Sequence, residues 1–215
     1  MTMMPLVLVF DFDGVILESA EIKTRAFREL FSAYPDKVGA IVAYHEANAG
    51  IARFVKFRHI HEHILGKPLG PQEERALGER FSDLVVDEVI RCPFVPGALE
   101  LLKAYVKECP LFLASGTPEG ELCRLVEARN LSAFFRRVYG SPKGKPAILN
   151  DILNETRMTP DALLFIGDGR SDYEAAKATG AGFIGRARPG WPHPFEGLDV
   201  PVVADLFEVQ RYLTA

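Results

Sequence analysis

The chain has 215 residues, of which 48% are hydrophobic and 25% charged, a composition typical of a folded globular protein rather than a collagen-like or disordered one. The 25 basic and 29 acidic residues give a net charge of −4, without a basic run of the kind that marks a nucleic-acid surface. The most apolar stretch, Leu6–Phe10, is too short to span a bilayer, and residues 1–10 lack the features of a secretion signal. We therefore expect one large domain, or one domain plus a smaller one, with neither nucleic acid nor membrane as partner.

The three cysteines are scattered along the chain and form no CxxC pair. They are Cys92, Cys109 and Cys123. An odd and dispersed set of this kind suits a reducing cytoplasm better than a disulfide framework. The expected location is therefore cytoplasmic.

Short apolar runs predict the strands of a parallel sheet that is buried on both faces. They are Leu6–Phe10, Leu111–Ala114, Leu163–Ile166, Gly182–Gly185 and Val200–Val203, with Val138–Tyr139 as a further short one. Helical patterns alternate with them at Pro118–Asn130, with Thr117 as the expected N-cap, at Pro146–Glu155 and at Asp172–Thr179. This alternation predicts an α/β fold, a Rossmann-like parallel sheet with helices on both faces.

The segment from about Glu18 to Arg91 differs, because it contains amphipathic helical patterns and no strand-like run. The patterns cover Glu21–Tyr34, Val38–Leu65 and Pro71–Ile90. The Pro- and Gly-containing stretch Cys92–Gly97 is typical of a linker that returns the chain to the sheet. We expect a core domain of residues 1–17 and 92–215, and an inserted all-helical cap domain of residues 18–91.

Two acidic motifs directly follow predicted strands, which is where ligands bind in open α/β sheets. Asp11 and Asp13 are two residues apart, so their carboxylates point to the same side, although an Asp-Gly pair is also typical of a solvated turn. Asp168 and Asp172 follow a later strand, where Asp172 alternatively only caps the next helix. Oxygen ligands in this number, without His or Cys, favour Mg²⁺ over zinc.

Two further motifs indicate phosphate binding. Ser115-Gly116-Thr117 combines a hydroxyl, a glycine and a helix N-terminus, which together suit an anion. The stretch Gly140–Pro146 resembles a P-loop only superficially, because its glycine spacing is one residue short and its last position is not Ser or Thr. It leaves Lys143 and Lys145 at a strand-to-helix junction, where a cation requires an anionic partner.

In chain order these motifs resemble the haloacid dehalogenase-like (HAD) superfamily of hydrolases, and within it the phosphoglycolate-phosphatase-like branch with a helical cap. Asp11–Ser19 looks like the first motif of the superfamily, and Ser115 matches the second. Lys143 or Lys145 matches the third, and Asp168 with Asp172 the fourth. Phe94–Gly97 resembles the usual Pro-Gly lead into the helix before the second strand, and the helical insert lies where many members carry a specificity cap. The resemblance covers the whole chain.

The resemblance implies a Mg²⁺-dependent phosphatase that acts on a small phosphorylated metabolite. Asp11 would be the nucleophile and form an aspartyl-phosphate, and Asp13 would be the general acid and base. The implied Mg²⁺ ligands are Asp11, the main-chain carbonyl of Asp13, and Asp168, with Asp172 as a further ligand or support. Ser115 and the Gly116 amide would hold phosphoryl oxygens. Lys145 would neutralise the nucleophile and the phosphate, and we prefer it to Lys143 because it directly precedes a helix.

The charges of this set predict a raised carboxyl pKa. Four carboxylates and a phosphate monoester of about −2 face only Mg²⁺ and one lysine. The mechanism needs a proton on Asp13, so we expect Asp13 to be the protonated group. Asp13 also favours phosphoryl transfer over dehalogenation, because cleavage of a carbon–halogen bond needs no acid.

Basic residues of the expected cap are candidates to bind an anionic leaving group, although a solvated helix face is the more typical role of such residues. They are Arg25, Arg53, Lys56 and Arg58. His59 and His63 are spaced i, i+4, and His61 lies between them, but no acid or cysteine is paired with them as zinc requires. We expect Phe54 and Phe57 to belong to the core of the cap.

Alternatives remain at this stage. A phosphomutase of the same superfamily uses the same first-motif residues, and a non-catalytic phospho-ligand-binding protein uses the same fold. A phospho-accepting receiver domain also combines Asp, Ser or Thr, and Lys, but the helical insert and the second acid pair argue against it. The sequence is compatible with a monomer or a homodimer.

Overall fold

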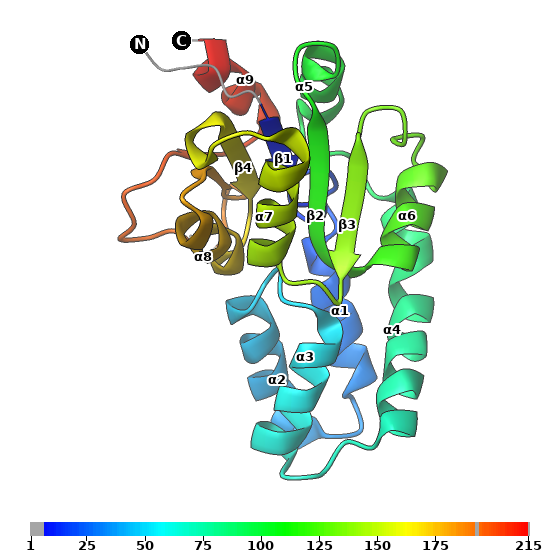
Figure 1. Ribbon diagram of the computed structural model, residues 1–215. Helices are drawn as coiled ribbons and strands as arrows, with labels where there is room; N and C mark the ends of the chain where they lie inside the picture. Colours follow the sequence, from blue (N-terminus) through cyan, green and yellow to red (C-terminus); the bar gives the residue numbers. More distant parts are fainter. Residues whose placement is uncertain (1–6, 192–193, 215) are drawn as a thin grey trace.

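The computed structural model describes residues 7–191 and 194–214. Its centre is a six-stranded sheet in the order β3-β2-β1-β4-β5-β6, in which all neighbours are parallel (Figure 1). The strands are β1 (Val7–Phe10), β2 (Leu111–Pro118), β3 (Arg137–Ser141), β4 (Leu163–Gly167), β5 (Gly182–Arg186) and β6 (Val202–Val203). The predicted Rossmann-like α/β fold is therefore confirmed, although Leu6 lies outside the described residues.

Alternate residues of each strand pack on opposite faces of the sheet. Leu8 and Phe10 belong to a hydrophobic cluster with α5 (Ala98–Tyr105), α6 (Glu119–Ala128) and α9 (Leu206–Thr214). Val7 and Val9 belong to a second cluster, with α7 (Lys145–Thr156) and α8 (Arg170–Thr179). Burial on both faces explains why the strands are continuous apolar runs in the sequence rather than alternating ones.

The junction between β2 and α6 differs from the prediction. The helix begins at Glu119, because β2 continues to Pro118, so Thr117 is a strand residue and not the helix N-cap. The Thr117 hydroxyl instead donates a hydrogen bond to Asp13 and accepts one from Lys23. By contrast, α8 ends at Thr179 as predicted, with Gly180 in a left-handed conformation as its C-cap.

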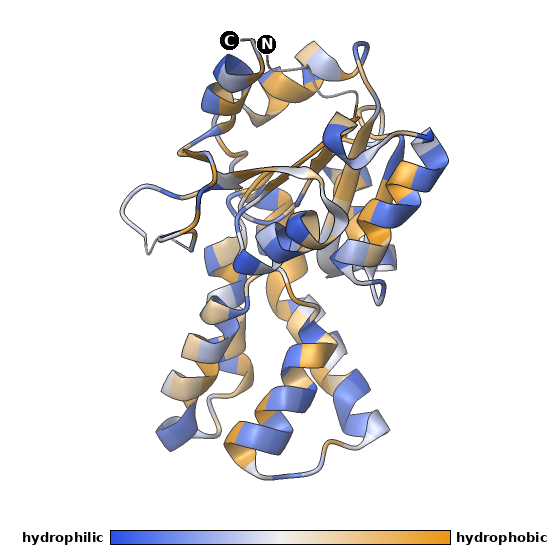
Figure 2. Ribbon diagram, turned by 60° about the vertical axis from the view of Figure 1, so that its left-hand side comes forward, coloured by the Kyte–Doolittle hydropathy of each residue, from blue (hydrophilic) through white to orange (hydrophobic). Residues whose placement is uncertain are grey.

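Between β1 and α5 the chain forms a helical segment beyond the carboxyl ends of the strands, below the arrowheads of β2 and β3 in Figure 1. It consists of α1 (Ala20–Leu30), α2 (Pro35–Ala47), α3 (Arg53–His59), the π-helical turn η1 (Ile60–Leu65) and α4 (Pro71–Arg91). Figure 2 shows both hydrophobic and hydrophilic residues along these helices, as expected of amphipathic elements. Among residues 7–191 and 194–214, no helix has the length and apolar character that crossing a bilayer requires.

The helical pattern predicted over Val38–Leu65 forms α2, α3 and η1, with a break in the helical backbone between α2 and α3. Gly50, in this break, has a φ of +81°, a conformation that disfavours a side chain. The prediction for Phe57 is confirmed, since it is fully buried against Phe27 and Phe81. Phe54 packs partly buried against the same core.

Candidate active site

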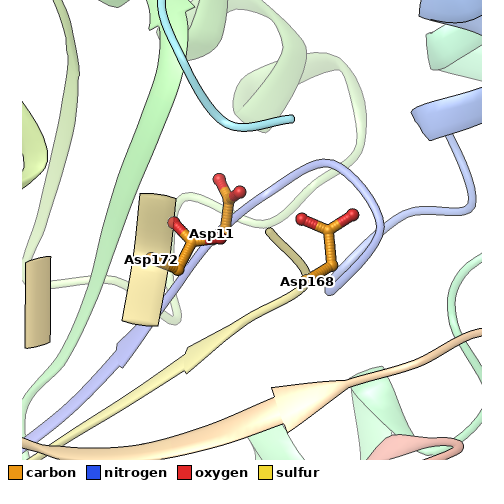
Figure 3. A group of neighbouring side chains, drawn as sticks. All are labelled: Asp11, Asp168 and Asp172. Carbon is orange, nitrogen blue, oxygen red and sulfur yellow. The ribbon is translucent and has the colours of Figure 1, made fainter. Parts of the chain in front are cut away.

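Three aspartates meet at the carboxyl edge of the sheet. Asp11 follows β1, Asp168 follows β4, and Asp172 lies in the first turn of α8 (Figure 3). One carboxylate oxygen of each lies within 4.8 Å of the others. They meet because β1 and β4 are paired, with Phe10 opposite Ile166, so that the residues after both strands are neighbours. The two acidic motifs therefore lie next to each other in the fold.

Lys145 is the cation of this cluster. It is the first residue of α7, and its buried ammonium donates to Asp11 Oδ2 at 2.9 Å and to Asp172 Oδ1. Burial lowers the pKa of Lys145, but the two carboxylates outweigh that effect and raise it above its usual value. Lys143 instead is an exposed residue that pairs with Asp151. The expectation that a lysine at this junction has an anionic partner is confirmed.

The cluster contains more carboxylates than cations. Burial, together with Asp172 and Asp13, raises the pKa of Asp11 to about 7 despite the neighbouring Lys145. Burial and the nearby Asp11 and Asp172 also raise the pKa of Asp168 well above its usual value. Both oxygens of Asp172 are satisfied, by Lys145 and by the Gly169 amide at 3.0 Å. The Asp168 carboxylate accepts no hydrogen bond from the described residues, so it is available to a ligand.

Asp13 has a different environment, and the expectation that its pKa is raised is wrong. Its carboxylate pairs with Lys23, accepts from the Ser19 hydroxyl at 2.6 Å and accepts from the Thr117 hydroxyl at 3.2 Å. Burial raises the pKa of Asp13, but Lys23 and these hydrogen bonds lower it overall. The raised carboxyl pKa values predicted from the charge balance therefore belong to Asp11 and Asp168.

Lys23 is the site residue that the sequence reasoning missed. It lies in the first turn of α1, four residues after Ser19, and its ammonium also donates to Thr117 Oγ1 at 2.7 Å. The i, i+4 spacing of Ser19 and Lys23 directly after the first motif is the signal that could have found it, because such residues share one helix face.

Two glycines permit close approaches at this site. A Cβ atom on Gly14 would lie 2.0 Å from Asp168 Oδ2, so only glycine allows the Asp168 carboxylate to reach the loop after β1. A Cβ atom on Gly50 would lie 2.5 Å from Ser171 Oγ and 2.9 Å from Lys145 Nζ. The Ser171 hydroxyl also donates to the Ala49 carbonyl at 2.7 Å. The loop between α2 and α3 therefore packs directly on the acidic cluster.

One cavity of about 610 Å³ joins the strand edge to the helical segment. Asp11, Asp13, Asp168, Ser115 and Gly116 line it from the sheet. His45, Arg53 and Lys56 are among the residues that line it from the helical segment. Ser115, near the end of β2, is buried, and its hydroxyl oxygen accepts from the Thr117 amide at 3.2 Å. Ser115 and Gly116, two of the three predicted phosphate-binding residues, therefore face the same space as the predicted nucleophile, whereas the third, Lys145, contacts Asp11 directly.

The basic candidates of the helical segment divide into two pairs. Arg25 and Arg58 are exposed and pair with Glu88 and Glu74, as expected of a solvated face. For Arg53 and Lys56 that expectation is wrong, because only 5% and 3% of their surfaces are exposed. Both belong to α3, whose buried face packs toward the core of the segment and the cavity.

Arg53 connects the helical segment to α6, a helix that packs against the sheet. Its guanidinium forms a buried ion pair with Glu121 of α6 and donates to the Ser82 hydroxyl at 2.8 Å. Its charge is therefore balanced within the protein.

The three histidines around η1 have separate contacts. His59 stacks on Tyr44 with ring centroids 4.1 Å apart and also packs against His63. His61 is buried and contacts Phe31 edge-on.

Comparisons with known proteins agree with this geometry. The model of the family described as "Hydrolase: haloacid dehalogenase-like hydrolase" matches residues 6–180. The chain belongs to this family. Among curated relatives, "Phosphoglycolate phosphatase 1" of Pseudomonas aeruginosa is 25% identical over 185 residues, which cover 83% of this chain and 68% of the relative.

Two solved structures share the fold. A hydrolase from Pseudomonas syringae aligns with a TM-score of 0.81 and 18% identity, covering 97% of this chain and 98% of that one. The β-phosphoglucomutase of Clostridium difficile aligns with a TM-score of 0.75 and 18% identity, covering 98% of each chain. Identities this low establish the common architecture but do not separate hydrolase from mutase.

Proposed function

We propose that this HAD-like hydrolase is a Mg²⁺-dependent phosphatase that hydrolyses a small phosphorylated metabolite through an aspartyl-phosphate. The observation that carries the proposal is Asp11, a buried carboxylate held by Lys145 at the edge of the sheet and facing a cavity that Ser115 and Gly116 also line. A nucleophile of this kind must be ionised to attack phosphorus, and the Lys145 ammonium favours the ionised form. The position of Lys145 supports it, rather than the exposed Lys143, as the third-motif lysine.

In the first step an Asp11 oxygen attacks the phosphorus, and the bond from phosphorus to the leaving oxygen breaks. Asp13 donates a proton to that leaving oxygen, and the ionised Asp13 then takes a proton from the water that hydrolyses the aspartyl-phosphate. The pairing with Lys23 suits Asp13 to the second step. A phosphate dianion beside Asp13 would raise its pKa and so supply the proton for the first. Ser115 Oγ and the Gly116 amide would donate to phosphoryl oxygens throughout.

The donor set fits Mg²⁺. Asp11, Asp168 and Asp172 offer hard oxygen atoms close together, and burial together with the neighbouring carboxylates raises the pKa of Asp11 and of Asp168, so that a cation among them would be favourable. We infer that Asp11, the Asp13 carbonyl and Asp168 would hold the ion, and that Asp172, whose oxygens are already hydrogen-bonded, orients Lys145. When bound, Mg²⁺ would neutralise the phosphoryl group and offset the repulsion between carboxylates.

Residues 18–91 would act as a cap over a core formed by residues 1–17 and 92–215. The loop around Gly50 supports this role, because it contacts Ser171 and approaches Lys145 at the cluster. A cap in this position would exclude water while the phosphoryl group is transferred to Asp11.

The experiment is phosphate release from a panel of phosphorylated metabolites that includes 2-phosphoglycolate. We expect release with Mg²⁺, loss of release with EDTA, and a decrease of at least about 1,000-fold in Asp11→Asn. Release that persists in Asp11→Asn would refute the nucleophile. Isomerised phosphate esters without free phosphate would identify a phosphomutase instead, and ligand binding without turnover of any ester would indicate a binding protein.

A further inference from the structure

The loop of residues 48–52, between α2 and α3, lies against the motifs that follow β2 and β4. A Cβ atom on Gly116 would lie 2.5 Å from the Gly50 carbonyl oxygen, and one on Gly169 would lie 2.7 Å from the Ala49 carbonyl oxygen. Real Cβ atoms do not approach other atoms so closely, so each glycine permits a backbone contact that a side chain would exclude. The loop also lines the cavity, beside the predicted phosphate-binding residues.

A buried ion pair fixes the end of this loop. Arg53 directly follows the loop as the first residue of α3, and Glu121 lies in the first turn of α6. The Arg53 guanidinium binds both carboxylate oxygens of Glu121, with Nη1 3.1 Å from Oε2 and Nη2 paired with Oε1. Each of the two residues exposes only 5% of its surface. Two parallel hydrogen bonds of this kind specify both the distance and the orientation of the partners.

Glu121 also binds a second helix of the segment. The Ser82 hydroxyl of α4 donates to Glu121 Oε2 and accepts from Arg53 Nη1 at 2.8 Å. Figure 1 shows α4 beside α6, the helix that carries Glu121. One carboxylate, on a helix that packs against the sheet, therefore holds both α3 and α4.

The two linkers between the helical segment and the rest of the chain are held by other arginines. Arg186 pairs with Glu18 before α1, and Arg129 donates to the Cys92 carbonyl after α4 at 2.8 Å. Among the described residues, none of the hydrogen bonds of these two arginines involves Glu121. Loss of the Glu121 charge would therefore release the loop and leave the linkers in place.

We propose that Glu121 is a positioning residue, which through Arg53 holds residues 48–52 against Gly116 and so keeps the cavity closed over a phosphoryl group on Asp11. Glu121 is not among the described residues that line the cavity, so it acts through Arg53, which does line it. Without the carboxylate, the guanidinium would be buried without an anion, which favours opening of the loop to solvent. This inference rests on the proposed phosphatase function and adds the residue that excludes solvent from the aspartyl-phosphate.

The first measurement is hydrogen exchange of the backbone amides, which needs no substrate. In Glu121→Gln, which keeps the shape of the side chain but not its charge, we expect exchange in residues 48–56 to accelerate by about 10- to 100-fold, because charged hydrogen bonds are lost. Exchange in the linkers, residues 17–19 and 92–94, should change by less than about 2-fold. Glu127→Gln, at an exposed position of α6, is the matched control.

A second variant tests the same contact more gently. Ser82→Ala removes one partner of Glu121 and keeps the ion pair with Arg53, so exchange in residues 48–56 should accelerate by a smaller factor. It also takes the place of Glu121→Gln if that variant does not fold.

The second measurement is the fate of the phosphoryl group when glycerol is added, with the fastest ester of the panel as donor. Transfer to glycerol forms a bond between its oxygen and phosphorus, breaks the bond between phosphorus and Asp11, and leaves the hydroxyl proton on Asp13. We expect the ratio of glycerol phosphate to free phosphate to rise by at least about 3-fold in Glu121→Gln, because glycerol is larger than water and depends more on an open cavity. General destabilisation would not change this ratio, since only folded molecules turn over.

Unchanged exchange of residues 48–56 in Glu121→Gln and Ser82→Ala would overturn the inference, whatever the activity. Equal acceleration in the linkers, or faster exchange without more transfer to glycerol, would show that the ion pair only stabilises the fold and would refute the positioning role. If the wild-type protein hydrolyses no ester, the proposed function fails, and hydrogen exchange alone decides whether Glu121 holds the loop.

Discussion

Lys145 and Lys56 are both buried lysines at the candidate active site, but they belong to parts of the molecule with opposite charge balance. At the sheet edge, Lys145 faces two carboxylates, which raise its pKa. On the helical side, Lys56 faces neutral His45, and burial lowers its pKa to about 7. One end of the cavity therefore lacks positive charge and the other lacks negative charge. The two ends of the cavity therefore differ in their charge environment, with clustered carboxylates at the sheet edge and an ammonium without a carboxylate partner among the described residues on the helical side.

The largest change in the free energy of unfolding is expected when Lys145, the lysine with two carboxylate partners, is replaced. Lys145→Met leaves Asp11 and Asp172 buried without their cation, and breaking a buried pair of this kind costs about 3–5 kcal/mol. Urea denaturation of the metal-free protein at pH 8, where Asp11 is ionised, measures the loss. Lys143→Met is the control, because its exposed pair with Asp151 contributes less than about 1 kcal/mol. Equal effects of the two substitutions would contradict the electrostatic role of Lys145.

The next effect is stabilisation by Mg²⁺. At a concentration of 100 times its Kd, an ion that binds only the folded state adds about 2.7 kcal/mol to the free energy of unfolding. The affinity should increase as the pH rises through about 7, because Asp11 must lose its proton to bind the ion. Thermal unfolding with and without Mg²⁺ at pH 6 and pH 8 measures both effects. A Mg²⁺-dependent shift that persists in Asp168→Asn would argue against the proposed ligands.

The sheet and its acidic edge could be predicted because their signals are local in the sequence. The runs around Phe10 and Ile166 mark strands, and each motif follows its strand directly, so parallel pairing brings Asp11 and Asp168 together. Lys145 could be preferred to Lys143 for a similar reason, since only the former begins a helix.

The helical side could not be predicted to the same extent because its contacts depend on packing between distant segments. Whether a basic residue of α3 is solvated depends on where α6 and α2 lie, which the periodicity of α3 does not specify. Glu121 makes Arg53 a buried connection between two parts of the chain, and His45 makes Lys56 a buried, unpaired cation. The pKa of Asp13 was wrongly predicted for a different reason, because its partner Lys23 is local in the sequence but the spacing of Ser19 and Lys23 was not used.

The pH dependence of folding stability, a smaller effect, tests whether His45 is neutral in the folded protein. Its pKa is about 2 in the folded protein and 6.5 when unperturbed, so the unfolded chain binds a proton below pH 6.5 that the folded protein does not. Folding stability is therefore lost as the pH falls, by about 2 kcal/mol between pH 7 and pH 5. Urea denaturation at pH 7 and pH 5 measures this loss. Between these pH values the free energy of unfolding should fall by about 2 kcal/mol less in His45→Gln than in the wild type. His63→Gln, at an exposed position, should keep the wild-type dependence.

The smallest expected effect is that of Lys56→Met, which should raise the free energy of unfolding, whereas Lys145→Met should lower it. Lys56→Met removes a desolvated charge but leaves His45 Nδ1 without its donor, and these opposing effects leave a net gain of about 1 kcal/mol at pH 6. Because the pKa of Lys56 is lowered to about 7, the wild-type protein itself becomes more stable as the pH rises from 6 toward 10. The advantage of the variant should therefore disappear by pH 9, where Lys56 is already neutral in the folded state. A destabilised Lys56→Met at pH 6 would show that the lost contacts with His45 outweigh the cost of burying the ammonium, and would contradict this prediction.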